Sequence, residues 1–140
     1  MDEINELITP VQMRFATESD FTTLEIIFIT QERFVIWNLS PDFEGWYAGK
    51  ASQDDVAAMI LINSELRGTT RKGVILHEMT HALGLYGHSD KYSDGVLSYK
   101  WDTITEFSDR DRECIRFLYH PSITVGMTED EVRSLIHHLP

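Results

Sequence analysis

The sequence has little cysteine and no long apolar run. Its single cysteine, Cys114, excludes an intramolecular disulfide and any zinc cluster built from several thiolates. We expect Cys114 to be buried in a helix, as most lone cysteines are. No apolar stretch approaches the ~20 residues needed to cross a bilayer, so the sequence predicts no membrane span.

The start of the sequence has none of the features of a signal peptide. Its first ten residues, MDEINELITP, are acidic and lack an apolar stretch. We therefore expect either a cytoplasmic protein or one whose export segment is not part of this sequence.

Positive charge is also scarce. The chain has 12 lysines and arginines against 23 aspartates and glutamates, which gives a formal net charge of −11. Such a surface repels a phosphate backbone or an anionic lipid surface, so we expect no nucleic-acid partner and no membrane-surface partner. Hydrophobic residues make up 42% of the chain and charged residues 25%, which is typical of a folded globular protein. With 140 residues, we expect one domain over residues 1–140.

The first half of the chain carries the strand signals. Apolar residues occupy both faces of residues 22–30, which predicts a central strand covered on both sides. Residues 56–65, VAAMILINSE, predict another strand. Between them, residues 34–52 mix aromatics with proline and glycine, which favours a short strand or turn followed by an irregular loop.

Helical patterns dominate the second half. Residues 70–86 carry an apolar stripe of Ile75, Met79, Ala82 and Leu83, and Ser108 and Thr128 each begin a helix-capping pattern with an acid three positions later. A short helix within residues 2–15, limited by Pro10, is also expected. This order predicts an α+β domain, with a sheet and one helix in residues 1–86 and helices and loops in residues 87–140.

The stretch HEMTHALGLYGHS, residues 77–89, carries the clearest chemistry. His77 and His81 are four positions apart, so a helix places both imidazoles on one face, where they can reach one ion at about 2.0–2.1 Å. Glu78 stands beside them and can accept a proton from a bound water. The pattern H-E-x-x-H predicts a zinc site with a general base.

A third ligand is needed, and His88 is the candidate. On a continuous helix it would lie roughly 10 Å beyond His81 along the axis and could not share the ion. The helix must therefore end, and Gly84 is the natural place because glycine enters left-handed backbone conformations without steric cost. Gly87 would give a second flexible joint directly before His88.

These residues resemble the metzincin zinc peptidases, whose pattern is H-E-x-x-H-x-x-G-x-x-H. His77, Glu78, His81 and Gly84 fall in register, and His88 stands one residue late, in a manner similar to bacterial matrixin-like sequences. The resemblance implies a zincin fold, with a small mixed sheet packed on the active-site helix and a helical C-terminal subdomain. It also implies a zinc-dependent endopeptidase with Glu78 as general base and a secreted or periplasmic location.

A second likeness to the family lies downstream. Metzincins carry a tight turn with a methionine beneath the metal, often followed by a tyrosine. Here DGVLSY, residues 94–99, resembles that turn, with Leu97 at the methionine position and Tyr99 as the tyrosine. The resemblance implies that Tyr99 contacts the metal or stabilises the oxyanion, against the alternative of an ordinary core tyrosine.

The resemblance also implies a peptide or protein substrate that pairs with an edge strand. We predict Ala57 to Ser64 as that strand, and we expect a monomer.

Several alternatives stay open. Glu106 competes with His88 as third ligand, since another class of zinc peptidase uses a glutamate on a later helix. Asp90 and Asp94 could assist a structural calcium ion, although a solvated acidic loop explains them as well. The rival function is a zinc-stabilised binding or scaffold domain without turnover. Leu97 in place of methionine favours that rival, whereas Glu78, which a structural site does not require, argues against it.

Overall fold

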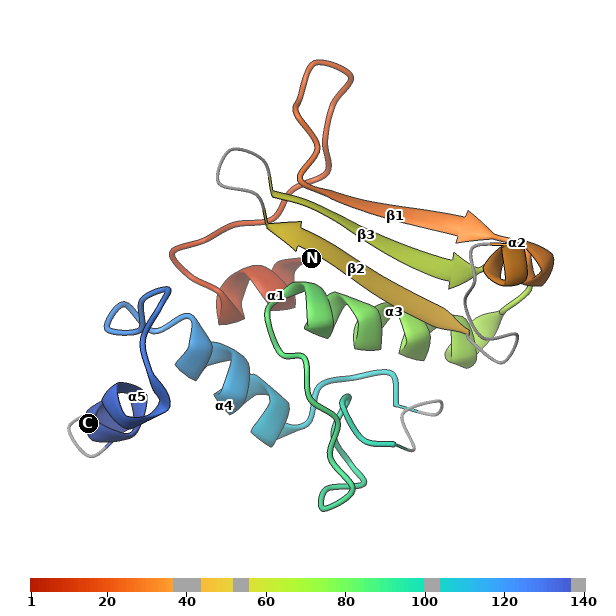
Figure 1. Cartoon of the computed structure of the whole chain (residues 1–140). Helices are drawn as coiled ribbons and strands as arrows, with labels where there is room; N and C mark the ends of the chain where they lie inside the picture. Colours follow the sequence, from red (N-terminus) through yellow and green to blue (C-terminus); the bar gives the residue numbers. More distant parts are fainter. Residues whose placement is uncertain (37–43, 52–55, 100–103, 137–140) are drawn as a thin grey trace. The chain divides into compact units, whose positions relative to one another are not determined.

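The computed structural model describes residues 1–36, 44–51, 56–99 and 104–136. Within these residues, five helices and three strands form a small mixed α+β architecture (Figure 1). The helices are α1 (Asp2–Leu7), α2 (Gln31–Ile36), α3 (Gly68–Ala82), α4 (Asp109–Leu118) and α5 (Glu129–Ile136). The strands are β1 (Leu24–Ile29), β2 (Gly45–Ala51) and β3 (Val56–Asn63). The predicted α+β class is confirmed at this level.

The chain divides into two compact units. One comprises Ala16–Asp111, and the other combines Met1–Phe15 with Arg112–Pro140. The first unit contains the whole sheet, α2, α3 and the H-E-x-x-H stretch.

The sheet has the strand order β1-β3-β2. β1 runs parallel to β3, whereas β2 runs antiparallel to it. Two strand predictions were therefore wrong. The strand predicted to be central, at residues 22–30, is the edge strand β1, and the predicted edge strand, Ala57 to Ser64, overlaps the central strand β3. Both strands are apolar on both faces, and such a pattern does not distinguish an edge strand from a central one.

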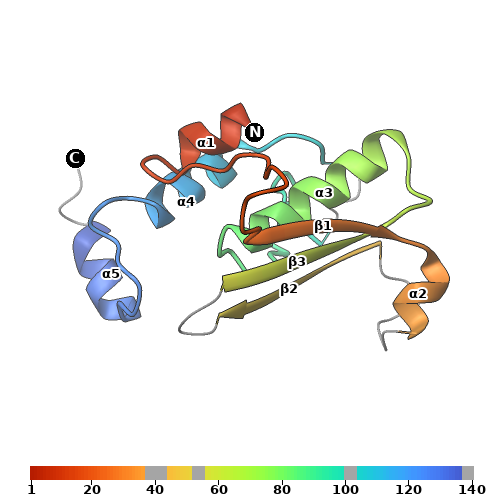
Figure 2. The same ribbon diagram turned by 90° about the horizontal axis from the view of Figure 1, so that it is seen from above.

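One face of the sheet is covered by α3, which packs on β2 and β3 (Figure 2). Ile60 and Ile62 of β3 point into this layer and are completely buried. The neighbouring residues of β1 on the same face, Ile26 and Phe28, are 41% and 48% exposed. On this face of the sheet, the side chains of β3 are thus buried, whereas those of the edge strand β1 stay partly exposed.

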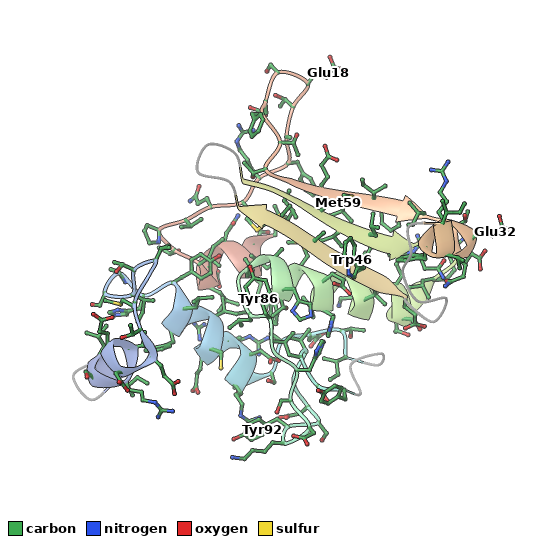
Figure 3. The ribbon with its side chains drawn as sticks, in the orientation of Figure 1. Glu18, Glu32, Trp46, Met59, Tyr86 and Tyr92 are labelled. Atoms are coloured by element: carbon green, nitrogen blue, oxygen red, sulfur yellow. The ribbon has the colours of Figure 1, made fainter. Side chains whose placement is uncertain are left out.

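The opposite face holds a second apolar cluster. Ile29, Phe34 and Leu61 are buried there, and Trp46 and Met59 pack against them. Figure 3 labels Trp46 and Met59 on the sheet. Phe34 comes from α2, a helix that the sequence did not predict. Six residues give a periodicity analysis less than two turns to detect.

The second unit confirms the predicted terminal helices. Ile4, Leu7 and Ile8 are buried in and after α1. At the start of α5, the Thr128 N–H donates to Glu131 Oε2 at 2.7 Å and the Glu131 N–H donates to Thr128 Oγ1 at 3.4 Å, which is the expected capping box.

Cys114 is a correction. It lies on the exposed side of α4, while its neighbour Ile115 is completely buried. Adjacent side chains on a helix point about 100° apart, so the buried face of α4 includes Ile115 but not Cys114.

Within the described part of the chain, no helix has both the length and the apolar character to cross a membrane.

Candidate metal centre

The metal-ligand candidates begin on the buried face of α3. Val74, His77, Glu78 and His81 follow the i, i+3, i+4, i+7 spacing and are all buried. The predicted apolar stripe is right for Met79 and Leu83, which are also buried. The polar residues of the motif form part of this buried face.

A glycine-terminated cap ends α3. Gly84 has a φ of 105°, a backbone conformation that side chains disfavour. Its N–H donates to the His81 carbonyl at 2.9 Å, and the Leu85 N–H donates to the Thr80 carbonyl at 3.3 Å. These two bonds form a Schellman motif. The predicted helix stop at Gly84 is confirmed.

The turn after Gly84 brings His88 back to the helix. Its Nε2 lies 3.0 Å from His77 Nε2, and His81 Nε2 lies 3.1 Å from the same atom. The three residues form a group whose ligand atoms all lie within 4.8 Å of one another. His77 and His81 are buried, whereas His88 is exposed, so the group can be reached from solvent.

Glycine is not required at position 87 for this return. Gly87 lacks a positive φ, and a Cβ built on it would meet nothing within 4 Å. The reversal of the chain therefore depends on Gly84 and not on a second glycine joint.

The donor atoms fit a zinc ion. Tetrahedral ligands about 2.0–2.1 Å from zinc stand about 3.3 Å apart, close to the observed nitrogen separations. The far ring nitrogens are also held: His77 Nδ1 donates to the Val96 carbonyl at 2.8 Å, and His81 Nδ1 to the Leu85 carbonyl at 2.7 Å. A carbonyl can only accept, so both bonds place the hydrogen on Nδ1 and leave the Nε2 lone pair facing the common point.

Burial sets the charge states of the group. Desolvation, with smaller contributions from His81 and His88, lowers the pKa of His77 from 6.5 to about 4. Burial and then His81 lower the pKa of His88. The His77 imidazole is therefore neutral at neutral pH, which is the form that binds metal. Burial raises the pKa of Glu78 from 4.5 to about 7.

The segment predicted as a methionine-type turn does form a tight turn. Ser98 N–H donates to the Gly95 carbonyl at 2.9 Å, and Ser89, next to His88, donates to the Leu97 carbonyl at 2.9 Å. Val96 of this turn contacts the candidate ligand His77 through its backbone carbonyl. No side-chain pattern in the sequence reveals such a contact.

Asp111 holds the same turn from the other side. Its Oδ2 accepts from the Val96 N–H at 3.1 Å and from the Ser108 N–H and hydroxyl, both at 2.8 Å. The Val96 peptide therefore links Asp111 on one side to His77 on the other. The sequence showed Asp111 only as a capping residue of α4; its second partner depends on the fold.

Tyr99 stands at the edge of the group. Its ring centroid lies 5.5 Å from that of His88, and the residue is 69% exposed. It is therefore no core tyrosine, and its predicted role toward the metal or the oxyanion stays a prediction.

The other acidic candidates lie outside the histidine group. In the parts of the chain that the structure describes, the group of potential ligands contains His77, His81 and His88 and does not include Glu106, Asp90 or Asp94. Asp94 instead pairs with Arg110 at 3.2 Å. The Arg110 guanidinium also stacks 3.7 Å from the ring centroid of Tyr92, near the end of the loop in Figure 3.

Comparison with known proteins gives one family. A family model described as a protein of unknown function, DUF2927, matches residues 43–138, well over half of the chain. The chain belongs to the DUF2927 family. The DUF2927 match includes β2, the whole of α3, the three histidines and Asp111. No curated protein and no solved structure matches the chain.

The helix stop predicts a difference between two neighbouring glycines. Gly84→Ala forces a Cβ into a left-handed backbone region at a cost of roughly 1–2 kcal/mol, and relief of that strain moves His88 away. We expect zinc affinity to fall about tenfold or more, measured by competition with a chromophoric chelator. Gly87→Ala adds the same methyl where there is space and is the matched control. Equal affinities for the two variants would contradict the role of Gly84.

The link through Val96 predicts a role for Asp111 in metal binding. Asp111→Ala removes the acceptor for the Val96 N–H, so the carbonyl that orients His77 is less well held. Outer partners of this kind typically contribute 10–100-fold to metal affinity, and we expect a loss in that range. Ser108→Ala breaks the Ser108 hydroxyl cap but keeps the contact with Val96, so zinc affinity should stay near wild type. A similar loss of zinc affinity in Asp111→Ala and Ser108→Ala would show that the helix cap at Ser108, and not the contact with Val96, is what supports metal binding.

Burial of Glu78 predicts a pH-dependent cost in the metal-free protein. Its folded pKa, about 7, lies above the ordinary 4.5, so the folded state keeps a proton that the unfolded state has lost. Stability therefore falls as pH rises from 4.5 to 7, by about 3 kcal/mol at most. Glu78→Gln has no such cost. In urea unfolding with chelator, it should gain stability over wild type at pH 8 and little at pH 5. An equal difference at both pH values would contradict this.

Proposed function

We propose that the protein is a zinc-dependent endopeptidase of the metzincin type, similar to the bacterial matrixin-like enzymes. The observation that carries the proposal is the convergence of the His77, His81 and His88 side chains, together with a buried glutamate that follows His77 directly on α3. The glycine-terminated helix and the tight turn at Gly95–Ser98 support the same assignment, since both were expected from the resemblance.

Three protein ligands leave one coordination position for water or substrate, as catalytic zinc sites do. Zinc, when bound, supplies a Lewis acid that polarises a carbonyl and acidifies water. The exposure of His88 gives a substrate access to this side of the group. His77 and His81, fixed by the Val96 and Leu85 carbonyls, hold their nitrogens in place without rearrangement.

Glu78 acts as the general base. A base is most effective when its pKa lies near the working pH, and burial brings that of Glu78 to about 7. Glu78 accepts a proton from the attacking water and delivers it to the departing amine. The same carboxyl group therefore serves both halves of peptide hydrolysis.

The substrate edge is assigned to β2. The earlier candidate, Ala57 to Ser64, is paired on both sides and cannot accept a further strand. β2 lies at the edge of the sheet and starts directly against Glu78, because Gly45 approaches that side chain closely. An extended peptide that pairs with β2 would pass close to the proposed base.

The central experiment separates zinc binding from turnover. Full-length protein and Glu78→Gln are loaded with zinc, and cleavage of casein and of a peptide library is followed with bound zinc measured in parallel. Loss of a general base typically costs 10²–10⁴-fold in rate. We expect a decrease of at least that size with zinc content unchanged. Glu106→Gln, the same change at an exposed glutamate outside the group, is the matched control and should cleave like wild type.

Two outcomes would contradict the proposal. Zinc retained with no cleavage by any of the proteins would favour the scaffold alternative, which Leu97 at the methionine position suggested. Cleavage by Glu78→Gln at the wild-type rate would remove Glu78 from the mechanism.

A further inference from the structure

β2 begins unusually close to α3. Gly45 pairs with Ile62 of β3, so it shares the face of the sheet that α3 covers. A Cβ built on Gly45 would lie 2.5 Å from Val74 Cγ1, 2.8 Å from Glu78 Oε1 and 2.9 Å from Glu78 Cγ. Real Cβ atoms do not approach other heavy atoms so closely, so a side chain at position 45 would require a movement.

Most of the surroundings of Gly45 cannot move easily. Val74 is completely buried and β-branched, so its side chain has few alternative rotamers. The strand is held by its pairing with β3, and at its start the Asn63 N–H donates to the Glu44 carbonyl at 2.9 Å. The Glu78 side chain, with three rotatable bonds, is the part that can give way most readily.

We propose that Gly45 is a positioning residue for Glu78. The bare backbone of β2 at this point leaves the space in which the Glu78 carboxylate lies, and any side chain there displaces the carboxylate. Glycine is present because of this close approach and not because of a special backbone angle, since Gly45 has no positive φ. The effect on turnover rests on the proposed function, whereas the effect on the place of the carboxylate does not.

The first measurement needs no activity. In the metal-free full-length protein, the ¹³C signal of the Glu78 carboxyl carbon is identified by its absence in Glu78→Gln. Gly45→Ala should shift this signal, whereas Gly87→Ala, which adds a methyl where nothing lies within 4 Å, should leave it in place. An unshifted Glu78 signal in Gly45→Ala would overturn the proposal.

The second measurement is a double-mutant cycle on the zinc-loaded protein. Misplacement of a catalytic group by about 1 Å can cost about 100-fold in rate, so Gly45→Ala should lower kcat by that order with zinc content and KM little changed. In the Glu78→Gln background the same change should have no further effect, because the group through which it acts is gone. Additive losses would indicate a general structural role and would overturn the proposal.

An inactive wild type and an unfolded Gly45→Ala variant would each leave the role of Gly45 testable. If wild type cleaves no peptide, the proposed function fails while the carboxyl signal still decides the role of Gly45. If Gly45→Ala does not fold, the comparison is made in a Val74→Ala background, which removes the nearest contact. A shifted Glu78 signal relative to Val74→Ala alone then supports the proposal, and an unchanged signal overturns it.

Discussion

The left-handed turn at Gly84 is the constraint on which the centre depends. It follows the end of α3 at Ala82, and the backbone bonds of the cap turn the chain back toward the helix. Two consequences follow from this single turn. His88 reaches the other imidazoles, and the Leu85 carbonyl becomes the acceptor that orients His81. One backbone conformation therefore brings in one candidate ligand, His88, and orients another, His81.

Burial gives the centre its chemistry. Removing ionisable groups from water disfavours their charged forms, which lowers the pKa of His77 and raises that of Glu78. The same physical cause thus yields imidazoles ready to bind a cation and a carboxyl group that exchanges its proton near neutral pH. The close approach of β2 at Gly45 contributes to this burial, because the strand covers the carboxyl side of the helix.

The sequence predicted the helical parts of the site well, because helix spacing relates neighbours within the same segment. His77, Glu78, His81 and Gly84 needed only local geometry. The arrangement of the strands in the sheet was harder to predict. β1 and β3 are apolar on both faces, so their patterns could not show that β3 is the central strand. β2 was missed as a full strand because Gly45, Ala48 and Gly49 have low strand propensity, although the small residue at position 45 is what permits contact with α3.

The residues that the sequence did not reveal share one property: they act through backbone atoms or through the absence of a side chain. Val96 and Leu85 each orient a histidine with a carbonyl, and Gly45 leaves space for a carboxylate. Asp111 is visible as a capping acid, but its bond to Val96 joins positions 15 residues apart. Motif spacing identifies donor atoms because chemistry fixes their residue types. The backbone carbonyls that orient those donor atoms can come from almost any residue type. Only the folded chain therefore shows which residues provide them.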